Sequence, residues 1–296
     1  MTTFERANLR NGLLFCLPWL IGLSVFTLYP VVASLFYSFC DYSVLQAPVW
    51  SGTENYRRMW GDKVFWLSLK NTLFFAGLSL PLGMAVALAL ALLLNTGVRG
   101  LPVFRTIFYL PSIVPIVASS MLWLWIFNGQ FGLLNSFLRP VLGSATPAWL
   151  ADPQWAKPAL VLMSLWGVGN SMVIYLAGLQ NVPGELYEAA AIDGAGVWRK
   201  FWHVTLPLIS PVIYFNLIMG IIGSLQVFTT VFAMTGGADG NPARSTLFYA
   251  LYLFSTAFYD LRMGYACAMA WVLFVVIVVL TVVATKLMEK RVHYAS

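Results

Sequence analysis

Residues 185–211 read ELYEAAAIDGAGVWRKFWHVTLPLISP and gather three carboxylates, two cations and a histidine in a chain that is otherwise strongly apolar. Only 9% of the 296 residues are Asp, Glu, Lys or Arg, whereas 60% are hydrophobic. Soluble domains carry about a quarter of charged residues. The composition therefore indicates a membrane protein, and the charged stretch is the feature that departs from it.

Charge-free windows lie on both sides of this stretch. Each is longer than the roughly 20 apolar residues with which a helix crosses a hydrocarbon core about 30 Å thick. A helix also satisfies its own backbone polar groups in lipid. We therefore predict an all-α integral membrane protein with six membrane-spanning helices, one in each of the windows 11–40, 71–98, 106–138, 158–184, 201–238 and 263–285.

The charged stretch itself predicts two short helices. Its first part, ELYEAAAI, favours helix and carries acids in the first turn, where the helix dipole stabilises them. Gly194 then stands where a glycine commonly follows a helix end. A second helical run at 197–206 carries Arg199 and Lys200, and Pro207 and Pro211 open the fifth span. This pattern predicts a helical hairpin on one membrane face, with an alanine-rich surface that another protein can approach closely.

The positions of Lys and Arg do not decide which face this is. Six spans place both termini on the same side, and the two sides then hold nine and eight cations. Orientation by the positive-inside rule requires a clear excess on one side. The charge distribution leaves the orientation open.

Spans three, four and five contain small, polar or proline residues at mid-membrane positions. Span three opens with LPSIVP, whose two prolines are predicted to bend or break the helix. Breaks survive in a membrane where protein or a water-lined cavity receives the freed carbonyls. Close helix packing through small residues is one explanation for the clusters LWGVGNS and MGIIGSLQ. The alternative is a passage for a polar solute, lined by Asn170, Ser171, Ser224 and Gln226.

The chain shows no chemistry of its own that would drive transport. No ionisable residue falls deep in a predicted span, although proton-driven pumps usually carry one. The GxxxxGK[ST] phosphate-binding motif is absent as well. Cys16, Cys40 and Cys267 have neither metal nor disulfide spacing, so we expect small buried apolar side chains. A passive channel, a sodium symporter and a pore powered by another subunit all remain open.

A family resemblance narrows these choices. The residues Glu188-Ala189-Ala190-x-x-Asp193-Gly194-Ala195, followed by Leu206-Pro207-x-x-x-Pro211, resemble the EAA loop of permease subunits of binding-protein-dependent ATP-binding-cassette importers. The resemblance implies a type I importer permease (MetI-like) fold. It also implies a loop that faces the cytoplasm and couples to a separate ATPase dimer, with both termini cytoplasmic. This chain would then be no enzyme and would hold no cofactor, since ATP and Mg would bind to the partner ATPases.

Further motifs resemble the carbohydrate branch of that family, namely Gly52, Asn55-Tyr56, Asn71-Thr72, LPSIVP, Gly236-Gly237 and Gly264-Tyr265. Within that branch, Tyr29-Pro30 and the loop ending in Glu54-Asn55-Tyr56 resemble the maltose-F or glycerol-phosphate-A type of subunit. The implied partners are a second, different permease, two ATPase subunits, an extracytoplasmic solute-binding protein, membrane lipid and a sugar, with no nucleic acid. The implied location is the cytoplasmic (inner) membrane of a bacterium or archaeon.

The resemblance also implies a division of the chain and two sets of functional residues, with no catalytic or metal-binding residue. Residues 1–62 form an N-terminal span and an external amphipathic loop, 63–287 the transport core with its coupling loop at 185–211, and 288–296 a cytoplasmic tail. The expected coupling residues are Glu188, Ala189, Ala190, Asp193, Gly194, Ala195, Leu206 and Pro207. The resemblance places the solute path at Ser112, Ile116, Ser164, Val168, Ser171 and Gly223. The polar side chains of spans four and five add Asn170, Ser224 and Gln226 to the expected solute-path residues.

Two other functions remain as alternatives to sugar import. One is import of glycerol 3-phosphate or a related polyol phosphate, and the other is a secondary transporter or channel that works alone. An anion is expected to require a cation or a helix N-terminus at mid-membrane. The spans contain no Lys or Arg at that depth, which favours a neutral sugar.

Overall fold

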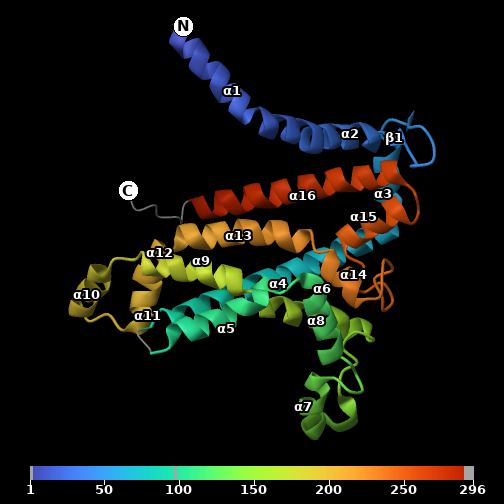
Figure 1. Ribbon diagram of the computed structural model, residues 1–296. Coiled ribbons are helices and arrows are strands. Elements are labelled where there is room, and N and C mark those ends of the chain that lie inside the picture. The colour runs from blue at the N-terminus through green and yellow to red at the C-terminus, as the bar shows by residue number, and fades with distance from the viewer. Residues whose placement is uncertain (1–2, 97–98, 290–296) are drawn as a thin grey trace. The chain divides into compact units, whose positions relative to one another are not determined.

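The computed structural model describes residues 3–96 and 99–289 (Figure 1). Of the predicted cytoplasmic tail, residues 290–296 lie outside the described residues. Within these residues, the regular secondary structure is helical apart from one pair of two-residue strands. It divides into two compact units, residues 3–62 with 253–274 and residues 63–252 with 275–289, and each is described by itself.

The first unit begins with a candidate span at Asn11–Ser38. This span consists of α1 (Thr3–Leu23), a π-helical turn (Ser24–Leu28) and α2 (Tyr29–Ser38). The strands β1 (Cys40–Asp41) and β2 (Val49–Trp50) follow and pair antiparallel, and then comes α3 (Glu54–Gly61). The unit also contains the end of α15 (Tyr249–Phe258) and the start of α16 (Met263–Glu289).

A polar corner holds together the part of this unit that follows α2. The buried amide of Asn55 donates to the carbonyl oxygens of Ser38, at 3.0 Å, and Cys40, at 2.8 Å. A Cβ on Gly264 would collide with the Cys40 carbonyl, so only glycine allows this approach. The Tyr265 hydroxyl donates to Asp62 at 2.8 Å. The motifs Asn55-Tyr56 and Gly264-Tyr265 thus have a structural use at this corner.

The three cysteines are free, and they differ in exposure. Cys40 is fully buried, and burial raises the pKa of its thiol. Cys267 is half-buried. Cys16 is exposed on α1, so the expectation of a buried side chain is wrong there, because a membrane-spanning helix can present an apolar thiol to lipid.

The second unit contains the remaining spans and the charged loop. Its helices in chain order are α4 (Lys63–Leu94), α5 (Leu101–Ile113), α6 (Ile116–Ile126), α7 (Leu133–Leu142), α8 (Pro153–Trp166), α9 (Gly169–Gln180), α10 (Gly184–Ile192), α11 (Val197–Lys200), α12 (Leu206–Leu208), α13 (Ser210–Leu225) and α14 (Thr229–Met234). A 3₁₀ turn follows α7 (Gly143–Ala145), and a π-helical turn (Phe201–Thr205) joins α11 to α12. In Figure 1, α10, α11 and α12 gather at one end of this unit.

Helix length and hydropathy confirm a chain with up to six spans. Among the described residues, three helices are long enough alone, at Asn11–Ser38, Lys63–Leu94 and Met263–Glu289. Three more spans are bent pairs: α5 and α6 at 98°, α8 and α9 at 46°, and the helical run Val197–Leu208 with α13 at 66°. The predicted break in span three is confirmed, since the chain is extended at Val114 and Pro115 between α5 and α6.

The ends of several spans differ from the charge-free windows. Helices α4, α5 and α8 begin before their windows and include Lys63, Arg105 and Lys157, because long cationic side chains can reach the membrane surface from a helix end. Helices α6 and α13 stop at Ile126 and Leu225, well inside their windows. Uncharged turns follow both helices, and a count of charges cannot detect them.

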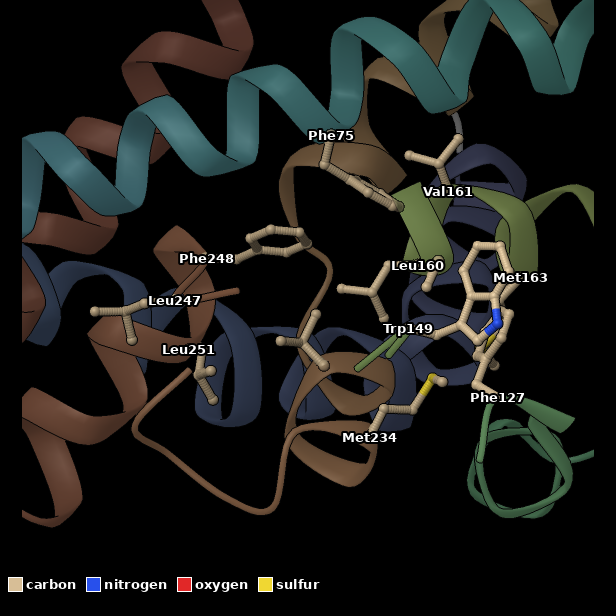
Figure 2. Close-up of a cluster of buried hydrophobic side chains, with 12 residues drawn as sticks. Phe75, Phe127, Trp149, Leu160, Val161, Met163, Met234, Leu247, Phe248 and Leu251 are labelled. Carbon is tan, nitrogen blue, oxygen red and sulfur yellow. The ribbon is translucent and has the colours of Figure 1, made fainter. Parts of the chain in front are cut away.

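A cluster of buried apolar side chains joins α4, α6, α8 and α14 (Figure 2). Phe75 from α4 packs against Phe248, with ring centroids 5.2 Å apart. Leu160 and Val161 of α8 and Met234 of α14 belong to the same cluster. Burial of these side chains explains why the chain leaves the helical path after Leu225 and forms α14.

Asn71 and Thr72 tie α4 to the segment that follows the turn at Gly236-Gly237. The Asn71 amide donates to the carbonyl oxygens of Arg244, at 3.0 Å, and Leu247, at 3.2 Å. The Thr72 hydroxyl accepts the Tyr249 N–H at 2.7 Å. This second motif of the carbohydrate-branch resemblance is therefore also structural.

Candidate solute cavity and coupling loop

A cavity of about 310 Å³ lies where spans three and four are bent. The α5–α6 break contributes Ser112 and Ile116, and α8 contributes Ser164. The last carbonyls of α5 and the first N–H groups of α6 have no partner within their own helices. Irregular backbone at membrane depth is tolerated where it lines a cavity. The break therefore offers backbone polar groups to whatever enters.

A second cavity of about 400 Å³ adjoins the first, with which it shares Phe75, Ser164, Gly167 and Val227. Its other walls come from α4, α9 and α13. The residues with polar side chains on these walls are Ser79, Ser171, Asn216 and Ser224. The two cavities form one polar-lined region along the bent spans.

The structure brings together eight of the nine predicted solute-path residues. The first cavity is lined by Ser112, Ile116, Ser164 and Asn170, and the second by Ser164, Val168, Ser171, Gly223 and Ser224. Gln226 does not join them. It is exposed at the C-terminal cap of α13, where the helix ends, and it lines neither cavity.

Several cavity hydroxyls are held by their own helices. Ser112 donates to the Tyr109 carbonyl and Ser164 to the Val161 carbonyl, each at 2.6 Å. A hydroxyl bound in this way still has lone pairs that accept. The Asn170 side chain makes no hydrogen bond within residues 3–96 and 99–289, so its amide can both donate and accept.

No Asp, Glu, Lys, Arg or His is among the residues that line these two cavities in the described chain. Trp166 lines the first cavity, and its ring lies 6.0 Å from that of Trp123. Hydroxyls, an amide, exposed backbone and an aromatic ring suit a neutral solute that has both hydroxyl groups and apolar faces.

Close glycine packing sets the geometry of this region. A Cβ on Gly169 would lie 2.8 Å from the Phe108 carbonyl and 3.0 Å from Ser112 Oγ. Helices α5 and α9 can approach this closely because position 169 has no side chain. The approach places Ser112 at the cavity wall.

The charged loop begins with α10, which ends in a Schellman motif. The Ala195 N–H donates to the Ala190 carbonyl at 2.8 Å, and the Gly194 N–H donates to the Ala191 carbonyl at 3.0 Å. Asp193 caps the helix, and Gly194 has φ of +74°, in the left-handed region. The motif residues 190 and 193–195 thus form one helix-ending unit.

Most side chains of α10 and α11 are exposed. Glu188 and Ala189 face outward on α10, and Ile192 and Val197 are 87% and 83% exposed. The loop is fastened where the Tyr187 hydroxyl bonds to the Thr205 hydroxyl at 3.0 Å. Exposed apolar side chains that lie close together are common where a protein contacts another protein or a membrane.

Leu206 and Pro207 lie at the bend that leads into α13. The Pro207 carbonyl would normally accept from the N–H of residue 211, but Pro211 has none. The Ser210 hydroxyl donates to that carbonyl instead, at 2.6 Å. Ile209 is fully buried against α4 and α9 and anchors the bend in the core. The bend is therefore held by one side-chain hydrogen bond and one buried side chain.

Residues 79–294 match the family model of the binding-protein-dependent transport system inner membrane component. The chain belongs to this family and is the membrane permease subunit of a binding-protein-dependent ABC transporter.

Among its relatives is the probable ABC transporter permease protein YesP of Bacillus subtilis (strain 168), with 41% identity over 96% of this chain and 92% of YesP. The lactose transport system permease protein LacF of Rhizobium radiobacter is 37% identical over 95% of this chain and 96% of LacF. One chain of a bacterial ABC transporter involved in alginate import matches with a TM-score of 0.84 and 24% identity, over 98% of this chain and 99% of that chain. The last match confirms the type I permease fold.

The sequence patterns did not predict every residue of the cavity walls. Thr230 and Val231 of α14 line the first cavity, and Phe75 lines both cavities. The sequence around α14 continues the apolar window of span five, so no charge or proline marks the helix break. Phe75 lies one turn after Asn71 on α4, and that spacing is the one signal that could have placed it near this region.

Proposed function

We propose that this chain forms half of the solute pathway of an ATP-driven importer for a neutral sugar or oligosaccharide. A second, different permease would form the other half. The observation that carries the proposal is the pair of adjoining cavities whose walls hold hydroxyls, an amide and Trp166 without an ionisable residue in the described chain. The names of two relatives, the lactose permease LacF and the trehalose/maltose permease MalF of Thermococcus litoralis, support a sugar.

The coupling loop would face the cytoplasm and dock on a separate ATPase dimer, which binds ATP and Mg. The exposed α10, with its alanine face and Glu188, supports this role. Both termini would then be cytoplasmic, with residues 1–62 supplying the first span and an external loop, 63–287 the transport core, and 288–296 the tail. An extracytoplasmic binding protein would deliver the sugar. A related alginate transporter has been solved with an alginate pentasaccharide-bound periplasmic protein, which supports such a partner.

A polyol phosphate is the second candidate solute. The sn-glycerol-3-phosphate permease UgpA of Yersinia enterocolitica is 33% identical over 95% of this chain. Lys157 is the cation of α8, but its Nζ lies 3.1 Å from Asn71 Oδ1 and over the Phe74 ring, and it does not line either cavity. This arrangement favours the neutral sugar.

The test is competition for uptake by the complete transporter, purified through a tag on this chain and placed in lipid vesicles with its binding protein. Unlabelled neutral disaccharides should inhibit uptake of one labelled disaccharide, and glycerol 3-phosphate should not. Transport of glycerol 3-phosphate in place of any neutral sugar would refute the choice of solute. Ser164→Leu, which narrows both cavities, should lower uptake while the complex stays assembled.

A further inference from the structure

An apolar groove of about 660 Å³ lies between α4 and the coupling loop. Its α4 wall is Ala85, Leu88, Ala89 and Leu92, and its loop wall is Tyr187, Val197, Trp198, Lys200, Phe201 and Thr205. None of these residues lines the two solute cavities. The groove is therefore a separate site, which we call the loop groove.

Lys200 is the one charged residue on the wall of the loop groove in the described chain. Its Nζ has no hydrogen-bond or ion-pair partner within the described residues. The two hydroxyls of the groove, on Tyr187 and Thr205, bond to each other at 3.0 Å. An occupant would therefore meet an apolar wall with a single unpaired cation.

The end of α4 and two exposed tryptophans indicate the depth of the groove in the membrane. The α4 wall covers the last turns of a spanning helix that ends at Leu94. Trp198 and Trp202 are 76% and 57% exposed at the same end, and tryptophans gather at the headgroup level of membranes. Basic pockets beside spanning helices on the cytoplasmic side bind anionic lipid headgroups.

We propose that the loop groove binds an anionic phospholipid of the inner leaflet. One acyl chain would lie along Leu88 and Leu92, and the phosphate would meet Lys200 Nζ. Such a lipid would contact α4 and the coupling loop at once, beside the Tyr187–Thr205 bond that fastens α10. The choice of leaflet rests on the orientation proposed above, whereas binding itself depends on neither sugar nor ATP.

The experiment is native mass spectrometry of the full chain, purified in detergent with an equal mixture of phosphatidylglycerol and phosphatidylcholine. The wild type should retain phosphatidylglycerol preferentially. Lys200→Gln should weaken that retention about fivefold, since one Lys near a membrane surface contributes about 1 kcal/mol. Lys200→Arg should restore it.

Arg199→Gln is the matched control, because Arg199 is exposed next to Lys200 and does not line the groove. It should retain the lipid as the wild type does. Ala89→Phe, which places a ring in the groove, should remove the bound lipid while the charge at position 200 remains. An equal loss of phosphatidylglycerol retention in Lys200→Gln and Arg199→Gln would overturn the proposal. It would also be overturned if, in the purified complete transporter, Lys200 cross-links to the second permease and no phospholipid is retained.

Discussion

At Gly194 the backbone lies in the left-handed region, with φ of +74°, and open space surrounds the position where a Cβ would stand. A substitution there acts through the backbone and not through a clash. Gly194→Val should cost at least about 1–2 kcal/mol in this conformation and should detach the end of α10. We expect lower uptake at normal membrane insertion, measured with labelled sugar in whole cells.

Gly194→Asn is the matched variant, since Asn tolerates the left-handed region better than other non-glycine residues. It should keep most of the uptake. Equal loss in both variants would show that the Schellman ending of α10 is not what position 194 provides.

Glu188 has no hydrogen-bond partner within the described chain and is exposed in the middle of α10. Glu188→Lys should therefore leave the subunit intact and disturb only what docks on it. We expect uptake to fall about tenfold, the effect of 1.4 kcal/mol, with ATP hydrolysis no longer stimulated by the loaded binding protein.

Glu185→Lys separates docking from helix stability. Glu185 lies in the first turn of α10, where reversing an acid costs about 0.3–1 kcal/mol through the helix dipole. Loss of α10 stability through the helix dipole should thus be larger for Glu185→Lys than for Glu188→Lys. If Glu185→Lys harms uptake more, Glu188 has no special part in docking.

At the scale of elements, substitution of two glycines in the spans by alanine should change the stability of the protein in opposite directions. Gly169→Ala would place a Cβ 2.8 Å from the Phe108 carbonyl, and overpacking of this kind costs about 1–3 kcal/mol. Gly77→Ala on α4 meets nothing within 4 Å and should gain up to about 1 kcal/mol. Thermal unfolding in detergent should show a lower Tm for the first and an unchanged or higher Tm for the second. Equal shifts would contradict the close α5–α9 packing.

Some features of these elements could be predicted from the sequence, and others could not. Charge-free windows predict the spans, Gly194 predicts the end of α10, and Pro111 with Pro115 predicts a break, because each signal is local. The 98° bend between α5 and α6 is not local, since α6 packs on α14. The polar cluster MGIIGSLQ predicts Gln226 at the solute path, whereas α13 ends at Leu225 and the chain continues to α14, where Val231 is buried.

At the scale of the whole molecule, the energy source should lie outside this chain. The cavity walls hold no titratable side chain in the described residues, whereas proton-driven transporters usually carry such a group in their spans. Collapsing the proton gradient with a protonophore, at constant ATP, should leave sugar uptake by the reconstituted transporter unchanged. A loss of uptake under these conditions would indicate proton coupling.

The most direct test is accumulation of labelled sugar in lipid vesicles that hold either the complete transporter or this chain alone. With the complete transporter, we expect accumulation only when ATP is present on the side of the coupling loop and the binding protein on the other. The same complex with Glu188→Lys should accumulate little sugar, and the chain alone none. Sugar flux through vesicles that contain this chain alone would contradict the account.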